Sequence, residues 1–135
     1  MILAALRVLD DEAARQFWQR RVFAVFEDEA QDSSPLQTRL LKTLAADAEQ
    51  PEAPLNLVRV GDPNQAINST FTPADPVFFN QFCDRAKQQP RLVVMAQAGR
   101  SSAVILAAAN ATLQSVPPSG LPGPVRPSPQ QPMHP

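Results

Sequence analysis

The sequence predicts an α/β fold in which helices flank a parallel sheet and a disordered, proline-rich tail follows. Segments with helical periodicity alternate with short apolar runs, in the order α-β-α-β-α-β-α, which favours parallel strands joined by right-handed crossovers. Of the 15 prolines, eight fall in residues 115–135, where no hydrophobic periodicity remains. We therefore predict a folded body in residues 1–114 and a disordered or polyproline-like tail in residues 115–135.

Residues 1–21 have the pattern of two helices. The apolar segment 1–9 is shorter than the roughly 20 residues of a membrane span, and its basic residue, Arg7, comes too late for a signal peptide. We interpret it as an amphipathic helix that packs on a core. The next helix has an apolar face and ends near two basic residues; the face comprises Ala13, Ala14, Phe17 and Trp18, and the end comprises Arg20 and Arg21.

A strand and a well-marked helix come next. Residues 22–26 (VFAVF) are apolar without alternation, which is typical of a strand covered on both faces. Ser34, Pro35 and Gln37 then supply an N-cap, a proline at the first helical position and a capping-box partner. The predicted buried stripe of this helix consists of Leu36, Leu40, Leu41, Leu44 and Ala48.

The strand–helix order then repeats. Residues 55–60 form the second predicted strand and residues 91–95 the third. Between them, a helix begins at residues 75–76 (Asp-Pro) and ends before Pro90. An alanine-rich helix is predicted over residues 102–113. The apolar face of the helix between the strands is predicted to consist of Val77, Phe78, Phe82 and Ala86.

The composition narrows the classes of function. Twelve basic and 13 acidic residues nearly cancel, which excludes a basic coat over the whole surface and leaves a local groove as the route to nucleic acid. The single cysteine, Cys83, excludes an internal disulfide and fits a reducing cytoplasm. Because the only histidine is His134, a zinc cluster is excluded as well. We expect a cytoplasmic protein without a membrane segment.

Polar clusters follow all three predicted strands, at residues 28–32 (DEAQD), 61–65 (GDPNQ) and 97–102 (QAGRSS). In open parallel sheets, ligands bind beyond the carboxyl ends of the strands. Three clusters at one edge of one sheet therefore predict a binding or catalytic site there.

The side chains of these clusters suit nucleotide hydrolysis. Asp28 can hold Mg²⁺ through water, and Glu29 beside it can orient or deprotonate an attacking water. Gln65 can bridge a phosphate or water to a neighbouring element, and Arg100 can reach a terminal phosphate. Taken singly, each has a plainer explanation. Residues 28–32 can be a solvated turn that caps the next helix, Gln65 can lie in an ordinary loop, and Arg100 can be a surface charge.

Three segments resemble motifs of UvrD/Rep-like superfamily I DNA helicases, in the order and spacing of that family. Residues 26–33 (FEDEAQDS) are similar to motif II, the Walker B segment DExQD. Residues 60–67 (VGDPNQAI) are similar to motif III, GDxxQxI, and residues 97–102 (QAGRSS), followed by Ala-Ala-Asn at 108–110, are similar to motif IV, QNYRS. Motif II alone is moderately specific, but the three together are strong and cover roughly residues 20–113.

The resemblance implies a partial RecA-like core of the P-loop NTPase type. It implies an enzyme that couples ATP hydrolysis to 3′–5′ translocation on single-stranded DNA. In that family, Asp28 would bind Mg²⁺ through water and Glu29 would be the catalytic base. Gln65 would sense the γ-phosphate and Arg100 would be an arginine finger, so that all four residues would surround Mg-ATP.

Several positions depart from the family pattern. Phe71, in the segment FTPAD, is where the family has FRGAD, and it would lie near the single strand. Asn68 stands where relatives stack an aromatic ring on a DNA base, Thr72 replaces the FRGAD arginine, and Gly99 replaces the tyrosine that stacks on adenine. Because stacking contributes about 1–3 kcal/mol per base, we expect a weaker grip on single-stranded DNA and on adenine.

The phosphate-binding loop of this family, GxxxxGK[ST], is absent from the 135 residues, in which no glycine precedes a lysine. Without that loop nothing cradles the β- and γ-phosphates, so we expect this chain alone not to hydrolyse ATP. The resemblance then implies an incomplete helicase core, a fragment that works together with the missing helicase portions.

Two other classes of function stay open. A non-catalytic interaction module, or degenerate remnant, would recruit a partner through the tail, in which residues 124–127 (PVRP) have a PxxP spacing. A GxxxxGK[ST] sequence encoded upstream of Met1 would favour the helicase over that module. A response-regulator receiver also has carboxylates at strand ends, but it needs a lysine after a later strand, where this chain has Gln97 and Arg100.

Overall fold

A computed structural model describes residues 1–65, 76–115 and 131–132 of the chain. These residues belong to two compact units, Met1–Phe79 and Asn80–Pro135, each of which we describe by itself. In the part of the chain that the structure describes, no helix has the length and the apolar character needed to cross a membrane.

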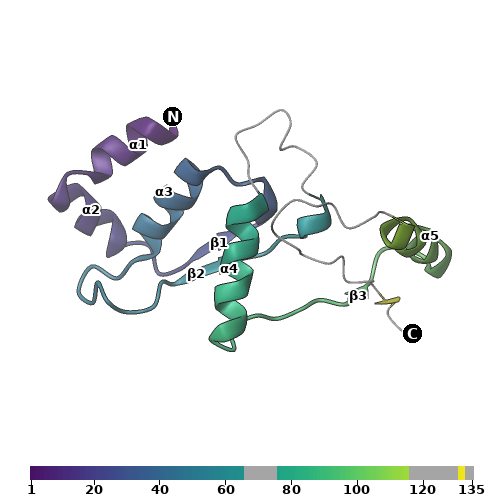
Figure 1. Ribbon diagram of the computed structural model, residues 1–135. Helices are drawn as coiled ribbons and strands as arrows, with labels where there is room; N and C mark the ends of the chain where they lie inside the picture. The colour runs from purple at the N-terminus through teal and green to yellow at the C-terminus, as the bar shows by residue number, and fades with distance from the viewer. Residues whose placement is uncertain (66–75, 116–130, 133–135) are drawn as a thin grey trace. The chain divides into compact units, whose positions relative to one another are not determined.

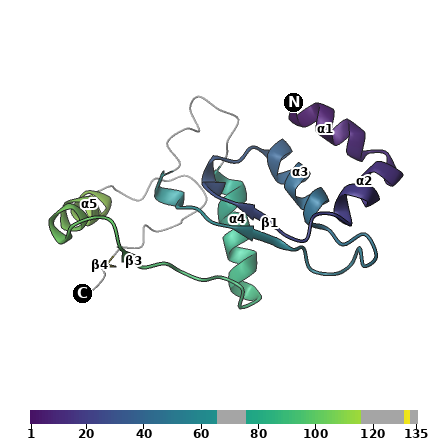
Figure 2. The same cartoon turned by 180° about the vertical axis from the view of Figure 1, so that it is seen from behind.

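Three helices of the first unit pack together: α1 (Ile2–Leu9), α2 (Glu12–Gln19) and α3 (Pro35–Ala45). The two views of the ribbon agree that α3 lies between the α1–α2 pair and the strands (Figure 1, Figure 2). The first unit is therefore layered, with the strands under α3 and α3 under the other two helices.

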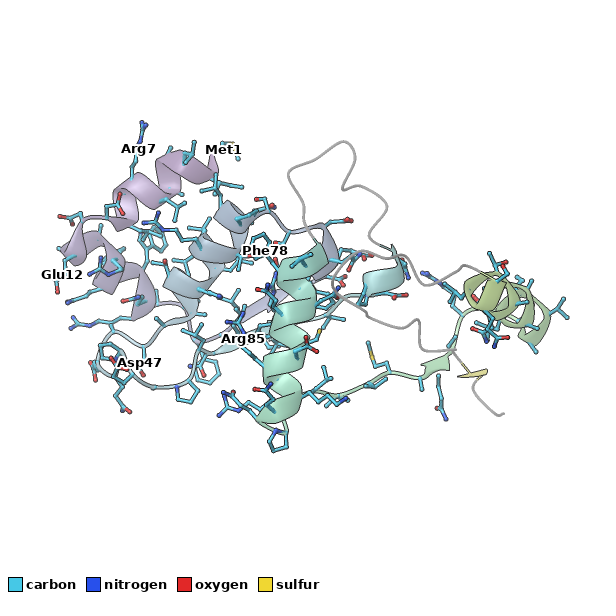
Figure 3. The ribbon with its side chains drawn as sticks, in the orientation of Figure 1. Met1, Arg7, Glu12, Asp47, Phe78 and Arg85 are labelled. Carbon is cyan, nitrogen blue, oxygen red and sulfur yellow. The ribbon has the colours of Figure 1, made fainter. Side chains whose placement is uncertain are left out.

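The two N-terminal helices occupy the predicted positions. Leu6 and Leu9 bury the apolar side of α1, while Arg7 points away from the neighbouring helices (Figure 3). The predicted amphipathic helix is thus confirmed. The apolar face of α2 is only partly covered, because Phe17 is 50% exposed and Trp18 is 47% exposed.

The start of α3 confirms the predicted cap in detail. Ser34 Oγ accepts the backbone N–H of Gln37 at 3.3 Å, Gln37 Oε1 accepts the backbone N–H of Ser34 at 2.9 Å, and Pro35 occupies the first helical position. Each bond satisfies a group that an uncapped helix end leaves without a partner. The helix therefore begins at the residue that the local sequence predicts.

The buried stripe predicted for α3 is partly wrong. Leu36 is exposed and Ala48 lies beyond the helix, which ends at Ala45, the residue that is buried instead. The helix ends there because the chain turns towards the next strand, and the carbonyl of Ala45 accepts the N–H of Asn56 at 3.0 Å. The remaining members of the stripe, Leu40, Leu41 and Leu44, are half-buried.

Strands β1 (Val25–Glu27) and β2 (Leu57–Arg59) form a two-stranded parallel sheet, which supports the predicted α/β class. Val25 pairs with Leu57 and Glu27 pairs with Arg59. Both strands are shorter than the runs 22–26 and 55–60 predicted from the sequence. A RecA-like sheet has further strands, so the RecA-like topology stays a prediction.

The expectation that the first strand, in residues 22–26, is covered on both faces is wrong. Side chains alternate along each strand between half-buried and exposed. Phe26 is 76% exposed, Val58 is 46% exposed and Val60 is 40% exposed, on the face opposite Glu27 and Arg59. Among the described residues of the first unit, α3 covers only one face, so the apolar run lacks the second layer that its composition suits.

Helix α4 (Pro76–Gln88) confirms the predicted position, but its buried residue at the start is Phe79, 4% exposed. Val77 and Phe78, which the sequence assigned to the apolar face, are 41% and 39% exposed. Phe79 is buried because its ring lies against the end of β2, where the Arg59 guanidinium sits 5.8 Å from the ring centre.

The third predicted strand is wrong. Residues 91–96 form no strand, and Val93 is 85% exposed. Strand β3 is the dipeptide Gln97–Ala98, which pairs in parallel with β4 (Gln131–Pro132) in a separate sheet of the second unit. Helix α5 (Ala103–Ser115) confirms the last predicted helix and buries Leu106. Apart from β4, the predicted tail lies almost entirely outside the described residues.

Candidate functional site

Two of the three predicted polar clusters lie next to each other at the carboxyl ends of β1 and β2. Asp28 and Glu29 follow β1 directly, and the short helix η1 (Ala30–Asp32) comes next. The N–H of Ala30 donates to the carbonyl of Val60 at 2.9 Å, immediately before the second cluster. The edge of the sheet thus brings residues 28–32 and 61–65 together, as parallel pairing requires.

The backbone at Glu29 is strained. Its φ is 51° and its ψ is 42°, which places it in the left-handed region. A residue with a side chain costs about 1–2 kcal/mol in this conformation, and such positions gather at functional sites. Asp28 Oδ1 accepts the N–H of Glu29 at 2.9 Å, which helps to hold the turn. Asp28 and Glu29 are both exposed to solvent.

A hollow of about 380 Å³ opens beside these carboxylates, between the end of β1 and the start of α3. Its carboxylate oxygens are the ligands that hydrated Mg²⁺ prefers. In the described residues, no group of three or more His, Cys, Asp or Glu side chains is placed to hold a metal ion directly. An ion bound through water to a single carboxylate does not need such a group. The hollow is lined by Glu27, Asp28, Glu29, Asp32, Ser33, Gln37, Leu40 and Leu41.

Gln65 ends the short helix η2 (Pro63–Gln65) that follows β2. Its backbone N–H donates to the carbonyl of Asp62 at 2.9 Å, and its Nε2 donates to Asp62 Oδ2 at 3.1 Å. The side chain is exposed, so it is accessible to a ligand at this edge.

Of the remaining predicted site residues, the structure describes only Arg100. Arg100 is exposed between β3 and α5, in the second unit, so the expectation of three clusters on one sheet is wrong for the third cluster. The physical reason is that β3 pairs with β4 and not with β2. Asn68 and Phe71 lie outside the described residues. Their roles stay predictions.

The sequence prediction missed a buried ion pair beneath the site. Arg59 Nε pairs with Glu27 Oε2, and the two side chains are 2% and 10% exposed. Ser33 Oγ donates to Glu27 Oε1, and Arg59 Nη2 donates to Thr38 Oγ1 at 3.4 Å. The signal was present, because Glu27 and Arg59 are opposite charges at the ends of two apolar strands.

A second missed residue is Gln31, which is 2% exposed. Its Nε2 donates to Glu29 Oε2 at 2.7 Å, and its Oε1 accepts the N–H of Asp62 at 3.1 Å. The resemblance to DExQD includes Gln31 as the glutamine of that motif, but it indicates neither the burial of Gln31 nor its hydrogen-bond partners. The geometry makes it the link between the two clusters.

Comparisons with known proteins match the part of the chain that contains both clusters at this edge. Residues 1–87 match the family model described as the UvrD/REP helicase N-terminal domain. The chain is 34% identical over 98 residues to the A subunit of an ATP-dependent helicase/nuclease from Latilactobacillus sakei subsp. sakei (strain 23K), covering 69% of this chain and 10% of that protein.

Two further relatives have the same description. The protein of Streptococcus pneumoniae serotype 2 (strain D39 / NCTC 7466) is 35% identical over 99 residues, which is 71% of this chain and 8% of the relative. That of Pediococcus pentosaceus (strain ATCC 25745 / CCUG 21536 / LMG 10740 / 183-1w) is 37% identical over 95 residues, 64% of this chain and 7% of the relative. The chain therefore spans 10% or less of the length of these curated relatives.

Proposed function

Because the chain belongs to the UvrD/REP helicase N-terminal domain family, we propose that it forms part of the ATPase core of an ATP-dependent DNA helicase. The body of this core is residues 1–114, in a RecA-like arrangement, and residues 115–135 are its tail. The complete enzyme moves 3′ to 5′ along single-stranded DNA in the cytoplasm.

One observation carries this proposal. Asp28 and Glu29 stand side by side at the carboxyl end of a parallel strand, exposed to solvent and beside the hollow. The strand pairing brings the Gly61–Asp62 turn to the same edge. A metal ligand, a base and a sensor group at one sheet edge are the parts that phosphoryl transfer to water needs from this side of the nucleotide.

The side chains then have distinct tasks. Asp28 holds the hydration shell of Mg²⁺, which supplies charge neutralisation at the phosphates. Glu29 orients the attacking water and accepts its proton. Gln65 contacts the terminal phosphate or the water, and Arg100 stabilises charge on the transferred group. Asn68 and Phe71 lie along the DNA strand.

Divalent-ion binding tests the proposal at Asp28. We expect Mn²⁺, used as a paramagnetic substitute for Mg²⁺, to broaden the backbone amide resonances of Asp28 and Glu29 in the 135-residue chain. This broadening should occur at lower Mn²⁺ concentrations than the broadening at other exposed acidic residues. Asp28→Asn should abolish this selective broadening, because it removes the charge that attracts the ion.

Asp47→Asn is the matched control. Asp47 is exposed in the turn after α3, where its Oδ1 accepts the N–H groups of Glu49 and Gln50 (Figure 3). This substitution removes the same charge from a turn outside the site and should leave the broadening at residues 28–29 unchanged. Broadening spread evenly over all acidic residues would contradict a metal site at Asp28.

Hydrolysis is a separate matter, because the chain lacks a GxxxxGK[ST] loop to cradle the β- and γ-phosphates. We expect phosphate release from ATP by the purified 135-residue chain to stay at the buffer rate, with or without single-stranded DNA. DNA-stimulated release that Glu29→Gln abolishes would show that this chain is catalytically complete and would overturn the expectation.

A further inference from the structure

Gln31 is the largest fully buried side chain in the described residues. Its amide makes hydrogen bonds to two different segments. The Nε2 group donates to Glu29 Oε2 at 2.7 Å, and Oε1 accepts the N–H of Asp62 at 3.1 Å. A buried amide costs free energy unless both its donor and its acceptor are satisfied. The two bonds therefore fix the orientation of the group.

The hydrogen bonds extend from Gln31 to a second site residue. Asp62 Oδ2 accepts from Gln65 Nε2 at 3.1 Å. A continuous path thus runs from Glu29 through Gln31 and Asp62 to Gln65. Its two ends are the residues proposed as the catalytic base and the phosphate sensor. Between them, Gln31 is buried and Asp62 is half-buried.

Gly61 provides independent support, because the amide of Gln31 packs against it where a side chain would otherwise lie. A Cβ atom at Gly61 would lie 2.5 Å from Gln31 Oε1, closer than atoms in contact can approach. The amide therefore occupies the space that any other residue at position 61 would fill. This close packing keeps Oε1 against the backbone that leads to Asp62.

We propose that Gln31 is a positioning residue that couples the Glu29 carboxylate to the loop carrying Gln65. The inference rests on the proposed function for the roles of Glu29 and Gln65, whereas the coupling itself is geometric. When Gln65 engages a phosphate, any shift of Asp62 moves one end of a planar amide whose other end holds Glu29. An amide is required because a carboxylate offers only acceptors and an apolar side chain offers neither group.

Gln31→Glu separates this coupling from simple packing, because glutamate has the shape of glutamine. The introduced carboxylate still accepts the N–H of Asp62 but cannot donate to Glu29, which it repels. In the 135-residue chain we expect NMR couplings to show that the side chain of Glu29 loses its single rotamer. Hydrogen exchange at the Asp62 amide should be nearly unchanged. In Gln31→Ala the rate of hydrogen exchange at the Asp62 amide should rise about tenfold, because one hydrogen bond is lost.

The double variant Glu29→Gln/Gln31→Glu exchanges donor and acceptor and should restore the single rotamer at position 29. A role in filling space alone predicts no such rescue. Gln16→Glu is the matched control, because Gln16 Nε2 donates to Glu12 Oε1 at 3.1 Å in an exposed helical pair, and it should leave Glu29 and Asp62 unaffected.

The proposal is overturned if the Glu29 rotamer survives Gln31→Glu, or if the exchange of donor and acceptor fails to restore it. If Gln31→Glu unfolds the chain, the double variant must recover the fold, and failure to do so also overturns the proposal. None of these measurements uses nucleotide or metal. A chain that passes them and fails the Mn²⁺ test keeps the coupling and loses the proposed function, while the reverse result removes only the coupling.

Discussion

Arg59→Met is expected to lower the free energy of unfolding by about 3–5 kcal/mol, the usual cost of removing one partner of a buried ion pair. The side chain of Arg59 is 2% exposed and that of Glu27 is 10% exposed. Ser33 Oγ continues to donate to Glu27 Oε1 in the variant, but one neutral hydroxyl cannot compensate a buried negative charge. Urea denaturation followed by circular dichroism measures the loss.

Arg39→Met makes the same chemical change at the surface and is the control. Arg39 Nη2 lies 3.5 Å from Asp10 Oδ1, and the two side chains are 64% and 66% exposed. Because exposed ion pairs contribute about 0–1 kcal/mol, this variant should lose less than about 1 kcal/mol. Equal losses in the two variants would show that the buried pair is not the source of the effect.

The double variant Glu27→Leu/Arg59→Met separates the ion pair from the packing of its side chains. Replacing both members of a buried pair by apolar groups is often neutral or stabilising. We therefore expect the double variant to be more stable than Arg59→Met alone. The loss of stability in the double variant is compared with the losses in Glu27→Leu and Arg59→Met measured separately. If it equals their sum, Glu27 and Arg59 do not interact in the folded chain.

Features set by neighbouring residues in the chain were predictable from the sequence. The cap of α3 was predicted because the hydrogen bonds that form it join Ser34 and Gln37, which are three residues apart. The acidic cluster after β1 was likewise marked by an apolar run followed at once by Asp28 and Glu29. In both cases the determining contacts span only a few residues.

Features that depend on distant partners were not predictable in the same way. Residues 91–95 have a strand composition, but a strand also needs a partner, and β3 forms two residues later with β4. The choice of Phe79 over Phe78 as the buried ring depends on where the end of β2 lies. The pairing of Glu27 with Arg59 requires the register of two strands, which neither strand contains by itself.

The site shows the same division. The residue types of Asp28, Glu29 and Gln65 suggested their chemistry, and the parallel sheet brings their segments to one edge. The role of Gln31 was not predicted because it depends on burial and on a hydrogen bond to Asp62, both of which require the folded chain. Groups that react are visible in a sequence, whereas groups that position them become visible when the chain is folded.

Gly61→Ala should lower the free energy of unfolding by about 1–3 kcal/mol, the range for an extra methyl group in a well-packed interior. The new Cβ would lie 2.5 Å from Gln31 Oε1 and 3.1 Å from both Ala30 N and Phe79 Cζ. Ala30 is 1% exposed and Phe79 is 4% exposed, so neither can move into solvent. Gln31 can move only by giving up its bond to the N–H of Asp62. Urea denaturation of the variant measures the loss.

A double-mutant cycle identifies which neighbour excludes a side chain at position 61. Gln31→Ala removes the amide that the new methyl group meets, so in that background Gly61→Ala should cost less by about 1 kcal/mol or more. The four proteins are compared by urea denaturation, with equal m-values as the condition for a valid cycle. An unchanged cost would assign the exclusion to Ala30 and Phe79. The close approach of Gly61 to Gln31 would then be incidental, and the case for Gln31 as the coupling residue would rest on its hydrogen bonds alone.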